Sequence, residues 1–129
     1  MVSVDTNVVI RLLTRDDEAQ YGKAYRLFDK KTVFVSDTVL LETEWVLRYA
    51  YELDRGLINE SLAGLLGLPN VRTAHPALIQ EALQWHRDGL DFADALHLAM
   101  SGHCDTMATF DKAFIKTAKG RSSCEVSLP

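Results

Sequence analysis

Hydrophobic residues along the chain follow two different periods, and the period changes repeatedly from one end to the other. Short apolar or alternating runs at residues 2–5, 32–36, 70–73, 106–109 and 124–128 predict five strands. Apolar residues spaced three and four apart predict helices at about residues 7–13, 16–30, 38–53, 59–68, 75–87, 93–100 and 112–119. This alternation is typical of an α/β domain in which helices cover both faces of a parallel sheet.

The predicted helix at residues 93–100 differs from the others because it is apolar almost all round, so we expect it to be buried in the middle of the fold. Asp91 and Asp94 stand three residues apart at its start. We expect Asp91 to be the N-cap and Asp94 to occupy the third helical position. Helix capping alone favours acids at these positions, so a structural and a functional explanation both stay open.

The composition is that of an ordinary soluble protein, because 129 residues with 47% hydrophobic and 25% charged side chains suit one domain with a real core. We therefore expect a single domain over residues 1–129. No run approaches the roughly 20 apolar residues of a membrane span, and the first residues lack a signal-peptide pattern, so a cytoplasmic location is expected. The net charge of −4 argues against a broad basic surface for nucleic acid, although acids gathered to bind cations would lower it by themselves.

Three further acids follow other predicted strands or lie near their ends. Asp5 ends the first strand, Asp111 follows the fourth, and Glu42 lies in the first turns of the helix after the second. Glu44 has a possible ion-pair partner four residues later, Arg48. Glu42 has no such partner and is predicted to lie on an apolar face, where an unpaired carboxylate is costly.

In an open parallel sheet, ligands bind beyond the carboxyl ends of the strands, which is where these acids are expected. Any one of them could be a helix cap, but several carboxylates that converge without cations would repel one another and raise their own pKa values. All the candidate ligands are oxygen donors, which favours Mg²⁺ or Mn²⁺ over Zn²⁺ and phosphodiester hydrolysis as the chemistry. His97 as a general base is a less favoured alternative, because a metal-activated water needs none.

Four motifs together resemble those of the PIN-domain nucleases. They are Asp5-Thr6-Asn7, Leu41-Glu42-Thr43-Glu44, Asp91-Phe92-Ala93-Asp94-Ala95-Leu96 and Thr109-Phe110-Asp111, and their order and spacing are similar to those of VapC-type toxins of toxin–antitoxin pairs. The resemblance implies a three-layer fold with a parallel five-stranded sheet in the order 3-2-1-4-5. It also implies a Mg²⁺- or Mn²⁺-dependent endoribonuclease, a homodimer, and a cognate antitoxin whose C-terminal segment occupies the active-site groove.

Carried over by motif, the resemblance implies an acidic quartet that holds one or two metal ions and carries the catalysis: Asp5, Glu42, Asp94 and Asp111. Asp94 is preferred to Asp91 as the third acid because it directly precedes Ala95-Leu96, and Asp91 becomes an auxiliary ligand or a cap. Polar residues beside the acids would orient the ligands or a water molecule: Thr6, Asn7 and Thr109.

Two surfaces of the predicted fold could bind partners. Basic residues of the last helix and just beyond it could contact the RNA backbone or form an ordinary solvated face: Lys112, Lys116, Lys119 and Arg121. The helices at residues 7–13 and 16–30, with Tyr21, Tyr25 and Phe28, could form an apolar groove for an antitoxin helix or simply pack in the core. The sequence does not choose among tRNA, rRNA and mRNA as the substrate.

Two other functions share the same acids. A metal-dependent phosphatase usually carries a second Asp two residues after the first, where this chain has Asn7. A non-catalytic module could keep the acidic pocket and bind metal or a partner without turnover.

Overall fold

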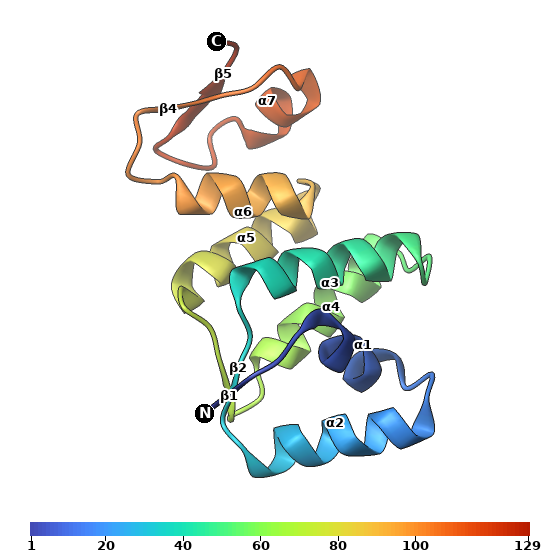
Figure 1. Cartoon of the computed structure of the whole chain (residues 1–129). Coiled ribbons are helices and arrows are strands. Elements are labelled where there is room, and N and C mark those ends of the chain that lie inside the picture. Colours follow the sequence, from blue (N-terminus) through green and yellow to red (C-terminus); the bar gives the residue numbers. More distant parts are fainter. The chain divides into compact units, whose positions relative to one another are not determined.

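The computed structural model describes residues 1–129, which divide into two compact units, Met1–Ala74 and His75–Pro129. The first unit contains β1 (Val2–Ser3), α1 (Thr6–Thr14), α2 (Glu18–Lys30), β2 (Val33–Phe34), α3 (Asp37–Tyr49), α4 (Arg55–Leu66) and β3 (Val71–Arg72). The second contains α5 (Pro76–Asp88), α6 (Phe92–Met100), β4 (Thr106–Ala108), α7 (Lys112–Ala118) and β5 (Glu125–Ser127) (Figure 1). None of the helices is both long and apolar enough to cross a membrane.

The first unit is built on a three-stranded parallel sheet in the order β1-β2-β3. Val33 in the central strand pairs with Val2 on one side and with Val71 on the other, and its side chain is fully buried. Helix α1 packs against α2 and α3, and α3 packs against α4. Apolar side chains from these helices form the core: Val9, Ile10, Leu40, Leu47, Ile58 and Leu62.

The second unit combines a helical pair with a two-stranded parallel sheet. Helices α5 and α6 pack together, β4 pairs with β5, and α7 packs against β5. The prediction of a buried helix near residue 95 is confirmed, because Ala95 and Leu98 of α6 are fully buried. Phe92 at its start is also buried and lies edge-on to His86 of α5, with ring centroids 5.5 Å apart.

The predicted α/β class and the parallel strands are confirmed, but a single five-stranded sheet is not what the strands form. They form two sheets, with the order 3-2-1 in the first unit and β4 beside β5 in the second. The prediction of one continuous sheet in the order 3-2-1-4-5 is therefore not confirmed. Each strand is only two or three residues long, so each pairing depends on few backbone hydrogen bonds.

Several element boundaries differ from the prediction, and the backbone explains why. Helix α3 ends at Tyr49 rather than near residue 53, because Glu52 adopts a left-handed conformation with φ 53° that breaks the helix. Helix α2 is capped by Asp17, whose side chain accepts from the amide of Gln20 at 3.0 Å. Thr14 is still part of α1, and its hydroxyl donates to the Ile10 carbonyl.

Candidate functional site

Asp5 occupies the turn between β1 and α1, as predicted, and it is the N-cap of α1. Its Oδ1 accepts a hydrogen bond from the amide of Val8 at 3.1 Å, and the side chain is exposed. The capping explanation is thus correct for this residue. It does not exclude a ligand role, because a carboxylate has two oxygens and only one of them is used by the cap.

Glu42 lies in α3 but not on an apolar face, so this part of the prediction is wrong. Its side chain is exposed, and Trp45, one turn further along, is 56% exposed. The aromatic side chains misled the prediction because Trp45 and Tyr49 pack against one another at the surface, with ring centroids 5.0 Å apart, rather than in the core. Glu42 makes no hydrogen bond or ion pair, so both of its oxygens are available to a ligand.

Glu44 is the buried acid of α3, with a relative exposure of 3%. The predicted ion pair with Arg48 is confirmed, because the guanidinium lies 3.2 Å from Glu44 Oε1. The two acids of the Leu41-Glu42-Thr43-Glu44 motif therefore have different roles. Glu44 forms a structural pair, and Glu42 faces solvent.

Asp91 and Asp94 stand at the start of α6, as predicted. Asp91 is the N-cap and its Oδ2 accepts from the amide of Asp94 at 3.2 Å. Asp94 is half-buried, and its carboxylate accepts no hydrogen bond. Burial raises the pKa of Asp94, and the negative charges of Asp91 and Asp111 raise it further, while His97 lowers it.

Asp111 caps α7, and one of its oxygens serves both cap bonds. Oδ1 accepts from the amides of Ala113 at 2.9 Å and Phe114 at 3.2 Å, which leaves Oδ2 without a partner. The hydroxyl of Thr109 accepts from the Asp111 amide at 3.1 Å. Thr109 therefore helps to fix the backbone that carries this acid, and its role in orienting ligands or water stays a prediction.

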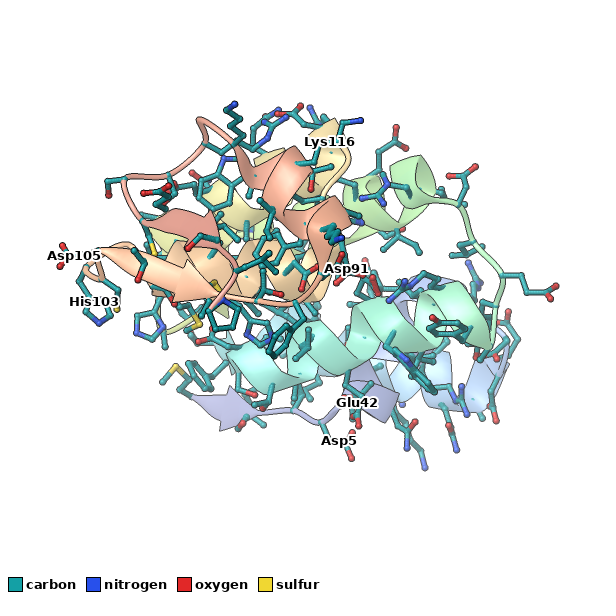
Figure 2. All side chains as sticks on the ribbon, turned by 90° about the horizontal axis from the view of Figure 1, so that it is seen from above. Asp5, Glu42, Asp91, His103, Asp105 and Lys116 are labelled. Atoms are coloured by element: carbon teal, nitrogen blue, oxygen red, sulfur yellow. The ribbon has the colours of Figure 1, made fainter.

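The structure brings the predicted acids together in two groups, one in each unit. In the second unit Asp91, Asp94 and Asp111 are close enough for their charges to interact. In the first unit Asp5 caps α1 and Glu42 lies in α3, these two helices pack together, and Figure 2 shows both side chains in the same part of that unit.

The chemistry of these groups fits a hard divalent cation. The free atoms are carboxylate oxygens, which Mg²⁺ and Mn²⁺ prefer. A cation would relieve the repulsion from Asp91 and Asp111 that adds to burial in raising the pKa of Asp94. Thr6 and Thr43, which directly follow Asp5 and Glu42 in the chain, are buried and their hydroxyls lack a hydrogen-bond partner. Buried hydroxyls without a partner are uncommon in folded proteins, and an ordered water or an ion is one way to satisfy them. No single group within the chain already forms a complete metal site of three ligating side chains.

The basic residues predicted to contact RNA fall into two kinds. Lys112, Lys116 and Lys119 are exposed. Arg121 is committed to the protein itself, because its Nη1 donates to Asp88 at 2.8 Å and its Nε donates to the carbonyl of Thr117.

The first unit has two surface hollows, and the sequence predicted residues of only one of them. One, of about 430 Å³, is lined by residues of α1, α2 and α4, including the predicted Tyr21, Tyr25 and Phe28. The other, of about 260 Å³, lies between α1 and α2 and includes Arg11, Gln20 and Lys23. No sequence signal points to this second group, because polar residues on the exposed face of a helix look the same in a pocket and on a solvated surface.

Comparison with known protein families gives one match. The chain matches the PIN domain family over residues 2–120, and it belongs to this family. PIN domains are in general metal-dependent nucleases that act on RNA. No curated protein and no solved structure matches the chain.

Proposed function

We propose that this protein is an endoribonuclease in which Asp5, Glu42, Asp94 and Asp111 together hold one or two Mg²⁺ or Mn²⁺ ions. The observation that carries the proposal is that each of these acids keeps at least one carboxylate oxygen free, even where the other oxygen caps a helix. Residues 1–129 then act as one PIN domain.

Hydrogen bonds within the chain hold two of these acids in position before a cation binds. The cap bonds of Asp5 and Asp111 hold each carboxylate at the start of a helix, so little side-chain freedom is lost when the second oxygen binds a cation. Asp91 is an auxiliary acid that raises the negative potential around Asp94. Thr6 and Asn7, beside Asp5, are proposed to orient ligands or water. The bound cation supplies Lewis-acid stabilisation of the charge that develops on the phosphate.

Positive side chains are needed to hold the RNA backbone near these acids. The exposed lysines of α7 and its C-cap supply them in this proposal, and Lys112 directly follows Asp111. Arg121 takes a lesser part, since its ion pair with Asp88 would have to break first.

We further propose that the nuclease is the toxin of a toxin–antitoxin pair in the cytoplasm and acts as a homodimer. The hollow of about 430 Å³ between α1, α2 and α4 supports an antitoxin partner. Tyr25 and Leu68 line it and are 53% and 40% exposed, which suits the apolar face of a docked helix. If this is correct, Tyr25→Ala will weaken neutralisation by the cognate antitoxin and leave cleavage unchanged.

The deciding experiment is cleavage of a mixed tRNA, rRNA and mRNA pool by the purified, partner-free chain with Mg²⁺, with Mn²⁺ and with EDTA. Asp5→Asn and Asp94→Asn should both abolish cutting, and the matched control Glu81→Gln, an exposed acid of α5, should not. Cutting that survives EDTA or both substitutions would overturn the proposal. Metal binding without cutting would favour the non-catalytic module, and turnover of a phosphomonoester in place of RNA would favour the phosphatase.

A further inference from the structure

We infer that Phe110 is the residue on which an unpaired base of the RNA stacks beside the proposed cleavage site. The inference rests on the proposed nuclease function and adds to it a substrate-binding residue. Phe110 lies between Thr109 and Asp111, directly before the acid proposed to bind the cation. Its side chain is 83% exposed, whereas Tyr49, the next most exposed aromatic side chain, is 59% exposed.

Contacts within the fold do not explain an aromatic residue at this position. A residue just before an N-cap can pack against the fourth helical residue as a hydrophobic staple, which here is Ile115. The exposure of Phe110 excludes a staple, because that contact would bury much of the ring. Phe114, buried at 4%, is the residue that anchors α7 in the core. None of the ring contacts in the chain involves Phe110.

Hydrogen bonds on both sides of Phe110 hold its backbone. The amide of Thr109 donates to the carbonyl of Ser127, at the end of β5, at 2.9 Å. The amide of Asp111 donates to the Thr109 hydroxyl at 3.1 Å, and the Asp111 carboxylate accepts the two cap bonds of α7. The ring therefore projects from a fixed backbone, so a base can stack on it without the cost of ordering a loop.

The two residues that follow Phe110 suit the charged part of a nucleotide. Asp111 Oδ2 has no partner, so it is available to a cation that also binds phosphate oxygens. Lys112 is exposed and offers a positive charge to the RNA backbone. A nucleotide uses the ring and both charges. An apolar protein segment would use the ring alone and would bury the two charges at a cost, so these neighbours favour RNA as the occupant.

Stacking on Phe110 sets the kind of selectivity that the ring can give. It needs a free base face, and in a duplex the neighbouring base pairs already cover both faces. Every base has such a face, so we expect little preference among the four bases. Removal of a stacking side chain weakens binding by about 5- to 150-fold, and one ring that contacts one base should lie in the lower part of this range.

Binding is measured in EDTA, without cleavage, by the fluorescence anisotropy of a labelled single-stranded RNA of mixed sequence. Phe110→Ala should weaken binding about tenfold, and Phe110→Trp, which keeps an aromatic ring, should stay within about twofold of the wild type. The matched control Leu57→Ala removes an exposed apolar side chain of α4 and should bind like the wild type. Binding of a duplex of the same sequence should change by less than about twofold in Phe110→Ala.

Two controls separate stacking from other effects of the substitution. Phe110→Ala should leave Tm within about 2 °C of the wild type, because the ring is exposed. The slope of log K against log salt concentration should also stay the same in this variant, because the ring neutralises no phosphate. Lys112→Ala should instead reduce this slope by about 0.7.

Cleavage with Mg²⁺ gives the second measurement. Phe110→Ala should raise KM about tenfold and leave kcat near that of the wild type, because the stacking contact is lost equally from the substrate and transition-state complexes. Asp111→Asn should instead lower kcat, because it removes charge from the proposed metal site.

The inference is overturned if the wild type does not bind single-stranded RNA, or if Phe110→Ala binds it as tightly as the wild type. It is also overturned if Phe110→Trp binds as weakly as Phe110→Ala. Loss of binding to a protein partner in Phe110→Ala, with RNA binding unchanged, would assign the ring to a protein interface instead. Failure of the nuclease proposal itself would appear as no cleavage of any RNA by the wild type, and the binding measurements in EDTA would then still decide on Phe110.

Discussion

Asp111 caps α7 and is proposed to bind a cation. Two substitutions at this residue separate these two roles. Asp111→Asn retains an oxygen that can accept the amide bonds of Ala113 and Phe114 but removes the charge. Asn and Asp are about equally good N-caps, so the stability of this variant should stay close to that of the wild type. Asp111→Ala removes both the cap and the charge.

The expected magnitudes follow from the size of the chain and the two cap bonds. Loss of an N-cap costs about 0.5–2 kcal/mol. Unfolding entropy of about 2.1 cal/mol/K per residue gives about 0.27 kcal/mol/K for 129 residues, so 1 kcal/mol shifts Tm by about 4 °C. We expect Asp111→Ala to lower Tm by about 2–8 °C and Asp111→Asn to leave it within about 2 °C. Both should reduce metal-dependent cleavage by at least about a hundredfold.

Asp54 provides the matched control, because it caps α4 through the Leu57 amide at 2.8 Å and has no proposed ligand role. Asp54→Ala should lower Tm by a similar amount, and cleavage measured well below Tm should stay at the wild-type rate. The reasoning is refuted if Asp111→Asn cleaves like the wild type, since the charge would then be dispensable. It is also refuted if Asp54→Ala loses cleavage as fully as Asp111→Ala, since a lost cap alone would then explain the effect.

Three further predictions concern stability. Asp94→Asn should raise Tm in EDTA, because it removes a charge that is disfavoured by burial and by the repulsion of Asp91 and Asp111, the causes that raise the Asp94 pKa. It should also abolish the Tm increase that Mg²⁺ gives the wild type, and a lower Tm in EDTA would contradict this. The hydrogen bond from the Tyr51 hydroxyl lowers the pKa of Asp16 below its ordinary 3.8, so this contact stabilises the fold above pH 3.8 and is lost as the pH falls through the lowered value. The Tm difference between the wild type and Tyr51→Phe should therefore shrink below pH 3.8, and a constant difference would show that Asp16 is not involved. Leu62→Ala empties a fully buried site of α4 and should cost about 2–5 kcal/mol in urea unfolding, and a cost below 1 kcal/mol would mean that the site collapses around the smaller side chain.

The order of helices and strands was largely predictable from the sequence, because periodicity reports which face of an element is buried. The N-cap at Asp91, the helical position of Asp94 and the burial of α6 all agree with the structure. The end of α3 was not predictable, because it depends on the left-handed backbone of Glu52, a residue type that rarely adopts this conformation. Strand order is also weakly specified by local pattern, since strands of two or three residues carry little register information.

The candidate acids were harder to interpret, and Glu42 and Glu44 show why. Both are glutamates of one helix, two residues apart, and apolar neighbours suggested that Glu42 was the buried one. In the structure Glu44 is buried and paired with Arg48, whereas Glu42 is exposed. Helical spacing gives the angle between two side chains but not which face turns inward when large aromatic residues such as Trp45 lie at the surface.

Capping and metal binding are difficult to separate from sequence because both favour an acid at the same place. The partial positive charge at a helix N-terminus stabilises a carboxylate there, and this stabilisation offsets part of the repulsion among Asp91, Asp94 and Asp111 when no cation is bound. The cap then uses one oxygen and leaves the other for a ligand, as at Asp5 and Asp111. A helix N-terminus is thus a site where an acidic ligand can be kept without a large cost to folding. The two explanations that the sequence left open for these acids are therefore compatible, and a charge-neutral cap such as Asn is the substitution that distinguishes them.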